Sequence, residues 1–331
     1  MFGYIIRRIV SAALVLLAVS VMVFALFFYG PSDPAQAMCP DSRCTPARLD
    51  AIRANLGLDQ PVAEQYGQYM KGIFVGREIA SGSINIPCDA PCLGVSFKLR
   101  VNVFDYLWDR VPATISLAIG GAIVFLTLGL TIGVTAARKR GTMADKAIVS
   151  SSLIVNSIPY YLLALLSYLY LVSKWAIVPE TGYYPITEDG PVAWFKGLLL
   201  AWIVLGLAYS TQYARFSRGS MIEAMSEDYV RTARAKGLKE SRVTLKHALR
   251  AAIVPIVTIF GLDFASLLAG TVFTEQIFSI QGIGLTALDA IGTQDLPIIS
   301  ATVLLASTLF VFSNIIVDIV YSLIDPRVRL T

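Results

Sequence analysis

The sequence of 331 residues has little of what water-soluble enzymes depend on. Asp, Glu, Lys and Arg make up 15% of it, against about 25% in an average soluble domain. It contains one histidine and four cysteines. So little charge argues against a soluble multi-domain enzyme, and one histidine leaves little material for a histidine-based catalytic centre. The same composition excludes a disordered chain, a disulfide miniprotein and a collagen-like repeat.

What the sequence has instead is apolar length. Hydrophobic residues make up 56% of it and the mean hydropathy is +0.66, which is typical of proteins that cross a membrane. A helix needs about 20 apolar residues to cross roughly 30 Å of hydrocarbon. Six stretches of about that length carry almost no charge: residues 9–29, 112–137, 147–173, 197–214, 251–274 and 296–324. The sequence therefore predicts an all-α polytopic membrane protein with six transmembrane helices.

The first stretch follows Arg7 and Arg8, as the apolar part of a secretory signal peptide does. It runs for about 21 residues, however, whereas such a region usually has about 7 to 15, and no small-x-small cleavage site closes it. We therefore expect it to form the first transmembrane helix.

The placement of basic residues predicts the orientation, because lysine and arginine near span ends are retained in the cytoplasm. With the N-terminus inside, seventeen of the 27 lysine and arginine residues fall on inner segments, nine of them between 215 and 250. The short outer loops hold only Lys174 and Lys196, and the other eight lie within 30–111, a segment long enough to be exempt from the rule. Aromatic residues mark the predicted outer span ends: Trp108, Trp175, Tyr183, Tyr184 and Trp194. Both termini are expected in the cytoplasm.

Residues 31–111 are expected to form a small extracytoplasmic domain, with helices over 46–57 and 62–74. All four cysteines lie in it: Cys39, Cys44, Cys88 and Cys92. In an oxidising compartment they would form two disulfides, with three possible pairings. Zinc is the alternative, although the C-x4-C and C-x3-C spacings match the usual metal knuckle poorly. We therefore expect disulfides and no metal site.

The basic inner segment 215–250 is too long for a simple connector and carries helix start and stop signals. Ser226 is a suitable N-cap, two acidic residues follow it, and cations occupy the later turns. Gly237 supplies the left-handed position that commonly ends a helix. These signals predict a short helix over 227–236, and Ser241 is expected to cap a second helix that leads into the fifth span.

A basic loop could serve only to fix the topology or to contact anionic lipid, but the order of residues here indicates more. The sequence EDYVRTARAKGL at 227–238, followed by HALR at 247–250, resembles the cytoplasmic EAA loop of ABC importer permeases, in the form found in the oligopeptide and dipeptide group. Ala233 and Gly237 match the general pattern. Arg231 replaces its first Glu, a departure that points to the peptide group.

The resemblance extends over nearly the whole chain and is greatest to the B-type subunit of peptide permeases. The matching segments are LGLDQP at 56–61 with Gln65 and Tyr66, RVPAT at 110–114, NSIP at 156–159, TE at 274–275 with Phe278, Gly282, Ile283 and Gly284, and DPRVR at 325–329. There are two departures. Gln281 stands where a proline is frequent, and 76–93 looks like a cysteine-containing insertion.

The resemblance implies the type I ABC importer permease fold. The chain would divide into 1–30 (cytoplasmic N-terminus and first helix), 31–111 (extracytoplasmic domain) and 112–331 (a five-helix permease core with the coupling loop 215–250). It implies a multi-pass protein of a prokaryotic plasma (inner) membrane that imports peptides, or, as in related systems, nickel, glutathione or sugars. The implied partners are a homologous C-type permease subunit, two cytoplasmic ABC ATPase subunits or one fused ATPase, and an extracytoplasmic substrate-binding protein. Lipid surrounds the spans, and no nucleic acid is expected.

The sequence contains no phosphate-binding GxxxxGK[ST] loop. The resemblance likewise implies no bound cofactor, no catalytic residue and no enzyme activity in this chain, with ATP and Mg used by the partner ATPase. In such permeases the short loop helix lies in a groove of the ATPase. The resemblance thus assigns ATPase coupling to Glu227, Arg231, Ala233, Arg234 and Gly237. Ala233 and Gly237 are expected to pack closely, and Arg231 and Arg234 to make polar contacts.

One chain with five core spans would enclose only half of a substrate path, and polar residues within spans are the candidates to line it. Asp263 is the strongest, because a carboxylate in mid-span is costly unless it is paired or hydrated, and a peptide amino group is a suitable cationic ligand. A structural pairing with a neighbouring helix or the partner chain is an equal alternative. Asn156 and Gln212 are weaker candidates, since such residues commonly bond helices together. Pro159 and Pro255 are expected to kink their spans.

Two other classes also fit six spans. An ion-coupled secondary transporter would show inverted repeats and broken helices near mid-membrane, but it gives no reason for a capped inner helix. A membrane anchor or receptor without transport gives Asp263 no purpose.

Overall fold

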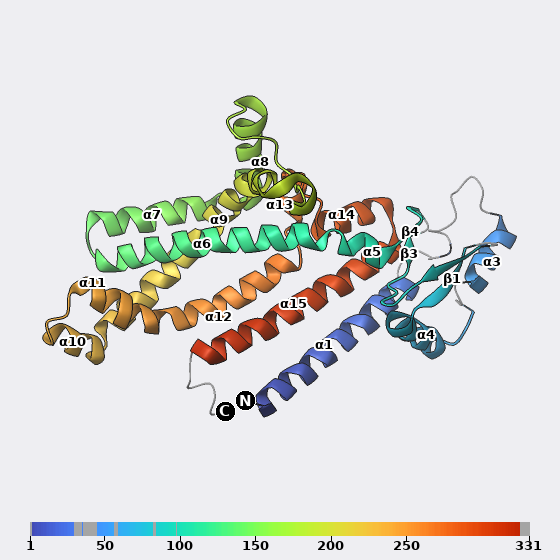
Figure 1. The fold of residues 1–331 in the computed structure, drawn as a ribbon, viewed down its shortest axis with the longest axis horizontal. Coiled ribbons are helices and arrows are strands. Elements are labelled where there is room, and N and C mark those ends of the chain that lie inside the picture. The colour runs from blue at the N-terminus through green and yellow to red at the C-terminus, as the bar shows by residue number, and fades with distance from the viewer. Residues whose placement is uncertain are drawn as a thin grey trace. The chain divides into compact units, whose positions relative to one another are not determined.

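The computed structural model describes residues 2–29, 35, 45–55, 59–81, 84–96 and 98–324, and these form mainly helices (Figure 1). The helices are α1 (Phe2–Tyr29), α3 (Pro46–Asn55), α4 (Val62–Val75), α5 (Val103–Trp108), α6 (Val111–Arg138), α7 (Met143–Ser157), α8 (Tyr160–Ser167), η1 (Tyr168–Lys174), α9 (Ile186–Ser226), α10 (Asp228–Ala235), α11 (Glu240–Arg242), η2 (Val243–Ala248), α12 (Leu249–Leu268), α13 (Val272–Ile277), α14 (Ile283–Thr293) and α15 (Leu296–Ile324). The strands are β1 (Arg77–Ser81), β2 (Ile84–Cys88), β3 (Val95–Ser96) and β4 (Val101–Asn102), paired antiparallel as β1–β2 and β3–β4.

The chain divides into two compact units. The first comprises Met1–Pro112 with Gly282–Val311, and the second comprises Ala113–Gln281 with Phe312–Thr331. The second unit holds α6 to α13, and α15 contributes to both.

The described residues contain five helices that are long and apolar enough to cross a membrane, or six if one bent pair counts as a single span. The predicted stretches 9–29, 112–137, 197–214 and 296–324 each lie within one helix, namely α1, α6, α9 and α15. The fifth stretch is shorter than predicted: α12 ends at Leu268, and Gly270 follows with a φ of 124°. By length and composition, the described residues thus hold five or six candidate spans, a range that includes the predicted six.

The third predicted span is not one continuous helix. Helix α7 ends at Ser157, and the chain bends by 88° before the helix formed by α8 and η1. Pro159 has no N–H to continue the ladder, and the residue before a proline is pushed out of the helical region. Ile158 accordingly has an extended backbone, with φ −83° and ψ 123°. The kink at Pro159 is confirmed, whereas α12 runs through Pro255 as one helix.

Within the second unit, glycines let α6 and α9 approach closely. A Cβ placed on Gly133 would lie 2.6 Å from the carbonyl oxygen of Ala214 and would also overlap the hydroxyl of Ser217. That hydroxyl lies 3.0 Å from the carbonyl oxygen of Gly129, one turn back along α6. Small residues at such crossings are typical of helix pairs in membranes, where close backbone contact stabilises association.

Within the first unit, α4 packs along α1. The Tyr66 hydroxyl lies 2.8 Å from that of Ser20, and the rings of Tyr66 and Tyr69 contact Phe24 at centroid distances of 5.3 and 5.9 Å. The helices predicted over 46–57 and 62–74 are observed as α3 and α4.

Two of the four cysteines lie at the end of the hairpin β1–β2 and just after it: Cys88 is the last residue of β2 and Cys92 follows four residues later. Cys88 and Cys92 form a disulfide, and both side chains are buried with Val95. This assigns no pairing to Cys39 and Cys44, which lie outside the described residues, as does the DPRVR segment at 325–329.

Candidate functional site

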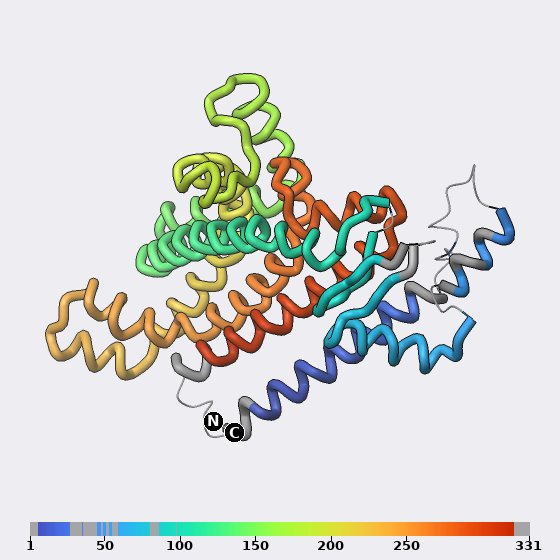
Figure 2. Tube along the Cα trace, turned by 45° about the vertical axis from the view of Figure 1, so that its right-hand side comes forward, coloured from blue at the N-terminus to red at the C-terminus, as the bar shows by residue number. Residues whose placement is uncertain are grey.

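The segment 215–250 folds back on itself between two long helices. The chain leaves α9, forms α10 and α11, and returns through η2 into α12, a turn visible in Figures 1 and 2. The short helix predicted over 227–236 is observed as α10, Asp228–Ala235. Its predicted N-cap was wrong. Ser226 is the last residue of α9, and its hydroxyl donates to the Glu223 carbonyl oxygen at 2.7 Å, so it does not cap the next helix.

The C-terminal end of α10 forms as Gly237 predicts. Gly237 has a φ of +75°. Its N–H donates to the carbonyl oxygen of Arg234 at 2.9 Å, and the N–H of Leu238 donates to that of Ala233 at 3.4 Å. These two bonds are the Schellman pattern that closes a helix on a left-handed residue. A Cβ at Gly237 would have nothing within 4 Å among the described residues. Glycine is therefore favoured here by the left-handed backbone and not by a lack of space.

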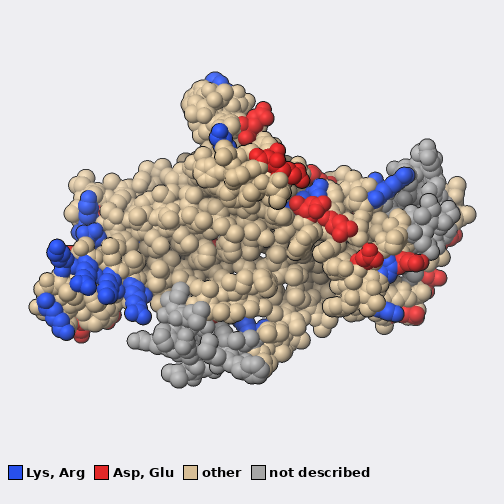
Figure 3. Space-filling model, in the orientation of Figure 1, with Lys and Arg blue, Asp and Glu red and all other residues tan. Residues whose placement is uncertain are grey.

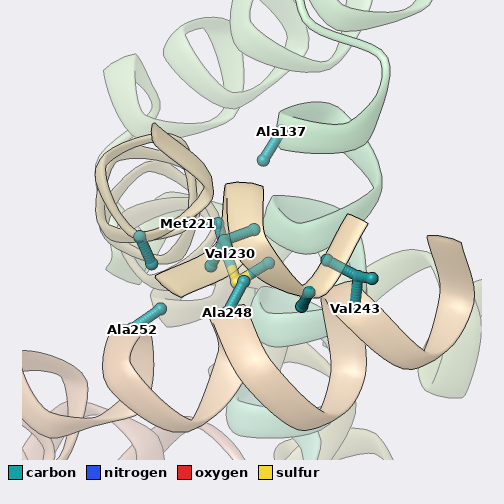
Figure 4. Close-up of a cluster of buried hydrophobic side chains, with 8 residues drawn as sticks. Ala137, Met221, Val230, Val243, Ala248 and Ala252 are labelled. Atoms are coloured by element: carbon teal, nitrogen blue, oxygen red, sulfur yellow. The ribbon is translucent and has the colours of Figure 1, made fainter. Parts of the chain in front are cut away.

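One face of α10 is buried in an apolar cluster, which we call the seat of α10 (Figure 4). Val230 and Ala233 are 0% and 6% exposed. The cluster brings together side chains from α6, α9, η2 and α12: Ala137, Met221, Ala224, Val243, Ala248 and Ala252. A helix of 8 residues has little stability in isolation, so its position depends on this packing. Ala233 thus packs closely, as predicted, and its contacts are with other helices of this chain.

The exposed residues of α10 carry charge. Arg231 is exposed and pairs with Asp228 at 3.2 Å, a surface contact of little energetic weight. Arg234 makes a two-pronged contact with Glu240, at 2.8 and 3.1 Å, which raises the pKa of the guanidinium. This ion pair joins α10 to α11. Glu227 precedes α10 with an extended backbone and an exposed side chain.

The second predicted helix begins earlier than expected. Helix α11 starts at Glu240 with Lys239 at its N-cap, so Ser241 lies inside the helix and the prediction that it caps it was wrong. From there η2, a stretch of π-helix, leads directly into α12.

The sequence reasoning missed a second anchor of this region. Asp145, at the start of α7, accepts two hydrogen bonds from Arg218 of α9, each 2.7 Å long. It also accepts the N–H of Gly141 at 3.0 Å, while its own N–H lies 3.4 Å from the Thr142 hydroxyl. The Asp145 side chain is 5% exposed. The spacing of Thr142 and Asp145 is that of a capping box, a signal from which the start of α7 could have been predicted, but not the bond of Asp145 to Arg218.

Lys and Arg side chains gather at the end of the second unit that holds α10 and α11 (Figure 3). The segment 215–250, which contains α10 and α11, holds nine basic residues, and four more end α6 and begin α7. The charge asymmetry of the sequence is thus also an asymmetry in space.

The predicted path residues do not form one cluster. Asp263 of α12 is half-buried and accepts a hydrogen bond from the Tyr213 hydroxyl of α9 at 2.9 Å. Gln212 is half-buried on α9 and Asn156 is exposed on α7. Among the described residues, the structure gives no hydrogen bond that joins any two of these three. Asp263 therefore has a helix partner, and a role in the path remains a prediction.

Two segments that the sequence singled out, RVPAT and TE, meet in the second unit. Thr114, from RVPAT, donates to the buried carboxylate of Glu275 at 2.9 Å. The neighbouring Thr274 shares a hydrogen bond of 2.7 Å with the hydroxyl of Tyr160, the first residue of α8. Sequence reasoning gave these residues no role. In the structure, hydrogen bonds of Thr114, Tyr160, Thr274 and Glu275 connect α6 and α8 to α13.

Comparison with known proteins gives two family matches. Residues 1–118 match the N-terminal model of binding-protein-dependent transport system membrane components, and residues 129–330 match the model of binding-protein-dependent transport system inner membrane components. A putative peptide transport system permease protein of Brucella abortus (strain 2308) is 36% identical over 99% of both chains. A probable peptide ABC transporter permease protein of Sinorhizobium fredii is 36% identical over 98% of this chain and 99% of its own. The dipeptide transport system permease protein of Escherichia coli (strain K12) is 32% identical over 99% of both.

Proposed function

The chain belongs to the family of binding-protein-dependent transport system inner membrane components, and we propose from this that it is the permease subunit of an ATP-driven importer of peptides. It is a multi-pass membrane protein, and the family implies work with a further permease, an ATPase and a binding protein. In our proposal these are a homologous C-type permease, two ABC ATPase subunits or one fused ATPase, and an extracytoplasmic binding protein. The chain binds no cofactor and hydrolyses no ATP itself.

The seat of α10 carries the mechanistic part of the proposal. A rigid element can transmit motion only if it is fixed to the spans that must move. Val230 and Ala233 fix α10 to α6, α9 and α12, and the charged residues of α10 remain exposed. In our proposal, closure of the ATPase dimer displaces α10, and the two long helices that it joins move with it. Glu227, Arg231 and Arg234 stand on the side that meets the ATPase, and Ala233 and Gly237 keep the element in shape.

The topology that goes with this function has both termini and the 215–250 segment in the cytoplasm. The concentration of Lys and Arg around α10 and α11 supports it, since such residues are retained inside. The 31–111 segment is then a disulfide-containing domain on the outer face, where it meets the binding protein. The permease core begins at residue 112.

Assembly and energy source are the decisive test. Expressed with its genetic neighbours and purified, the chain is expected to bring down a second permease chain and two ATPase domains. Reconstituted with the binding protein, the complex is expected to take up peptide only when ATP is hydrolysed. Uptake by the isolated chain without ATP would contradict the proposal and favour ion-coupled secondary transport, a class that the break between α7 and α8 would also suit.

The left-handed backbone at Gly237 is expected to be needed for coupling to the ATPase. A β-branched residue is strongly disfavoured there, whereas Asn tolerates it, and the left-handed region costs most residues about 1–2 kcal/mol. We expect Gly237→Val to lower binding-protein-stimulated ATPase activity about tenfold and Gly237→Asn to leave it near the wild-type value. Because a Cβ meets nothing within 4 Å, bulk alone does not explain a loss. Equal activity of the two variants would refute a coupling role for the turn.

Asp263 is proposed to line the path together with Gln212 and Asn156. Asp263→Asn removes the charge and keeps an oxygen for the Tyr213 hydroxyl, whereas Tyr213→Phe removes the hydrogen bond and keeps the charge. We expect the first variant to lower uptake of peptides with a free amino terminus about tenfold, and the second to change mainly thermal stability. The measurement is uptake in proteoliposomes at matched protein levels. Wild-type uptake by Asp263→Asn would assign Asp263 a structural role only.

A further inference from the structure

A pocket of about 340 Å³ lies beside α10. Arg138 and Arg140, at the end of α6 and in the turn that follows, line one side of it, and Arg234 and Glu240 line another. Ile222 and Met225 of α9 add an apolar wall. The pocket thus combines residues of 215–250 with a different loop, 139–142, to which the sequence gave no function.

The pocket carries an excess of positive charge. Arg234 and Glu240 neutralise each other through their two hydrogen bonds. Asp145, at the start of α7, accepts hydrogen bonds from Nε and Nη2 of Arg218 of α9, and its carboxylate also interacts with the charge of Arg140. The lining holds three arginines and one glutamate, so it carries about two positive unit charges that it does not itself balance. Two guanidinium groups over an apolar wall suit a carboxylate on a short aliphatic stem, because arginine binds carboxylates in two-pronged fashion.

The α9 wall of the pocket extends beyond the lipid headgroups. Ile222 lies eight residues beyond Ala214, the last residue of the uncharged stretch of α9. At 1.5 Å per residue this is about 12 Å along the helix. The headgroup layer adds only about 5–7 Å to the hydrocarbon on each side. The pocket thus begins at headgroup level, where Arg138 directly follows the uncharged stretch of α6, and extends along α9 beyond the headgroups to the side where α10 meets the ATPase.

We propose that this pocket binds an acidic side chain of the ATPase subunit, so that Arg138 and Arg140 form a second contact beside α10. The inference rests on the proposed function, and it adds a residue pair outside the coupling loop. One protruding acidic segment of the ATPase would enter between α6 and α11 while α10 lies in its groove. The second contact fixes α10 against rotation, because an element held at two points transmits displacement along a defined direction.

The test compares two double variants in the complete importer in nanodiscs. Arg138→Gln with Arg140→Gln removes the charge of the pocket. Lys139→Gln with Lys146→Gln removes two exposed charges near the same turn that do not line it. The measurement is the Kd of the ATPase for the membrane part, at about 50 and 300 mM NaCl. We expect the pocket variant to weaken binding about tenfold at low salt and to lose most of the salt dependence, because exposed charges are screened over about 10 Å at 0.1 M. The control is expected to change the Kd less than twofold.

Three results would overturn the inference. The first is equal binding by the two double variants. The second is a defect that occurs in nanodiscs with anionic lipid and vanishes in phosphatidylcholine, which would assign the pocket to a lipid phosphate. The third is a wild-type Kd for the pocket variant. In that last case Val230→Asp decides the wider question: if it abolishes ATPase binding the proposed function stands without the second contact, and if it does not, both fail.

Discussion

Val230→Asp is expected to abolish coupled transport while the rest of the chain still folds. Val230 is 0% exposed in the seat of α10, among Met221, Val243 and Ala248. An unpaired carboxylate there is strongly unfavourable, and a helix of 8 residues cannot remain folded without its packed face. Helix α10 should therefore detach. We expect peptide uptake to fall at least about 100-fold, which corresponds to about 2.8 kcal/mol.

Proteolysis reports the detachment directly, because cleavage within a helix requires it to open. Arg231 and Arg234 make α10 a trypsin site, and we expect cleavage there in inside-out vesicles to be much faster for Val230→Asp than for the wild type. Val230→Leu is the matched control, since it keeps the face apolar. Slow cleavage of Val230→Asp together with lost transport would contradict this explanation and assign Val230 a direct contact with the ATPase.

The spans were predictable because bilayer thickness leaves an uncharged run of about 20 residues few alternatives. The break in the third span was harder to predict, although Ile158 precedes Pro159 and a residue before proline is disfavoured in a helix. An apolar run looks the same in the sequence whether its helix is continuous or broken. Only the backbone restriction imposed by the proline tells the two cases apart. Local chemistry thus decided where 147–173 bends, and composition decided only that it is apolar.

The two caps failed for a common reason. Ser226 and Ser241 were assigned by local pattern, but α9 continues to Ser226 and α11 begins before Ser241. A serine hydroxyl within a helix bonds to a carbonyl three or four residues back, as Ser226 does with Glu223. Gly237, by contrast, was predicted correctly, since few residues other than glycine adopt a left-handed backbone readily.

The contacts that give the candidate site its rigidity could not be read from the sequence. Asp145 and Arg218 are 73 residues apart, and Tyr213 and Asp263 are 50 apart. No local pattern places such pairs together, because their proximity is decided by how α7 and α12 pack on α9. The resemblance identified the segment that carries function, and the fold adds what holds that segment in place.

The close crossing of α6 and α9 gives the second large effect, since α9 is the helix that leads into α10. Gly133→Val is expected to lower the free energy of unfolding by about 3 kcal/mol or more, and the thermal midpoint by roughly 6–12 °C. A Cβ at Gly133 meets backbone atoms of Ala214 and Arg218, at 2.6 and 3.0 Å. Backbone atoms cannot turn aside as a flexible side chain does, so the helices must separate and the hydroxyl of Ser217 moves away from Gly129.

Gly219→Val is the matched control, because it makes the same change within α9 where a Cβ has nothing within 4 Å. Both variants are to be purified in one detergent and melted with tryptophan fluorescence as the readout. A midpoint for Gly133→Val equal to that of Gly219→Val would show that the crossing tolerates bulk. A selective loss of stability would place the rigid connection between the spans and α10 at this crossing, since α6 also ends in the seat of α10 at Ala137.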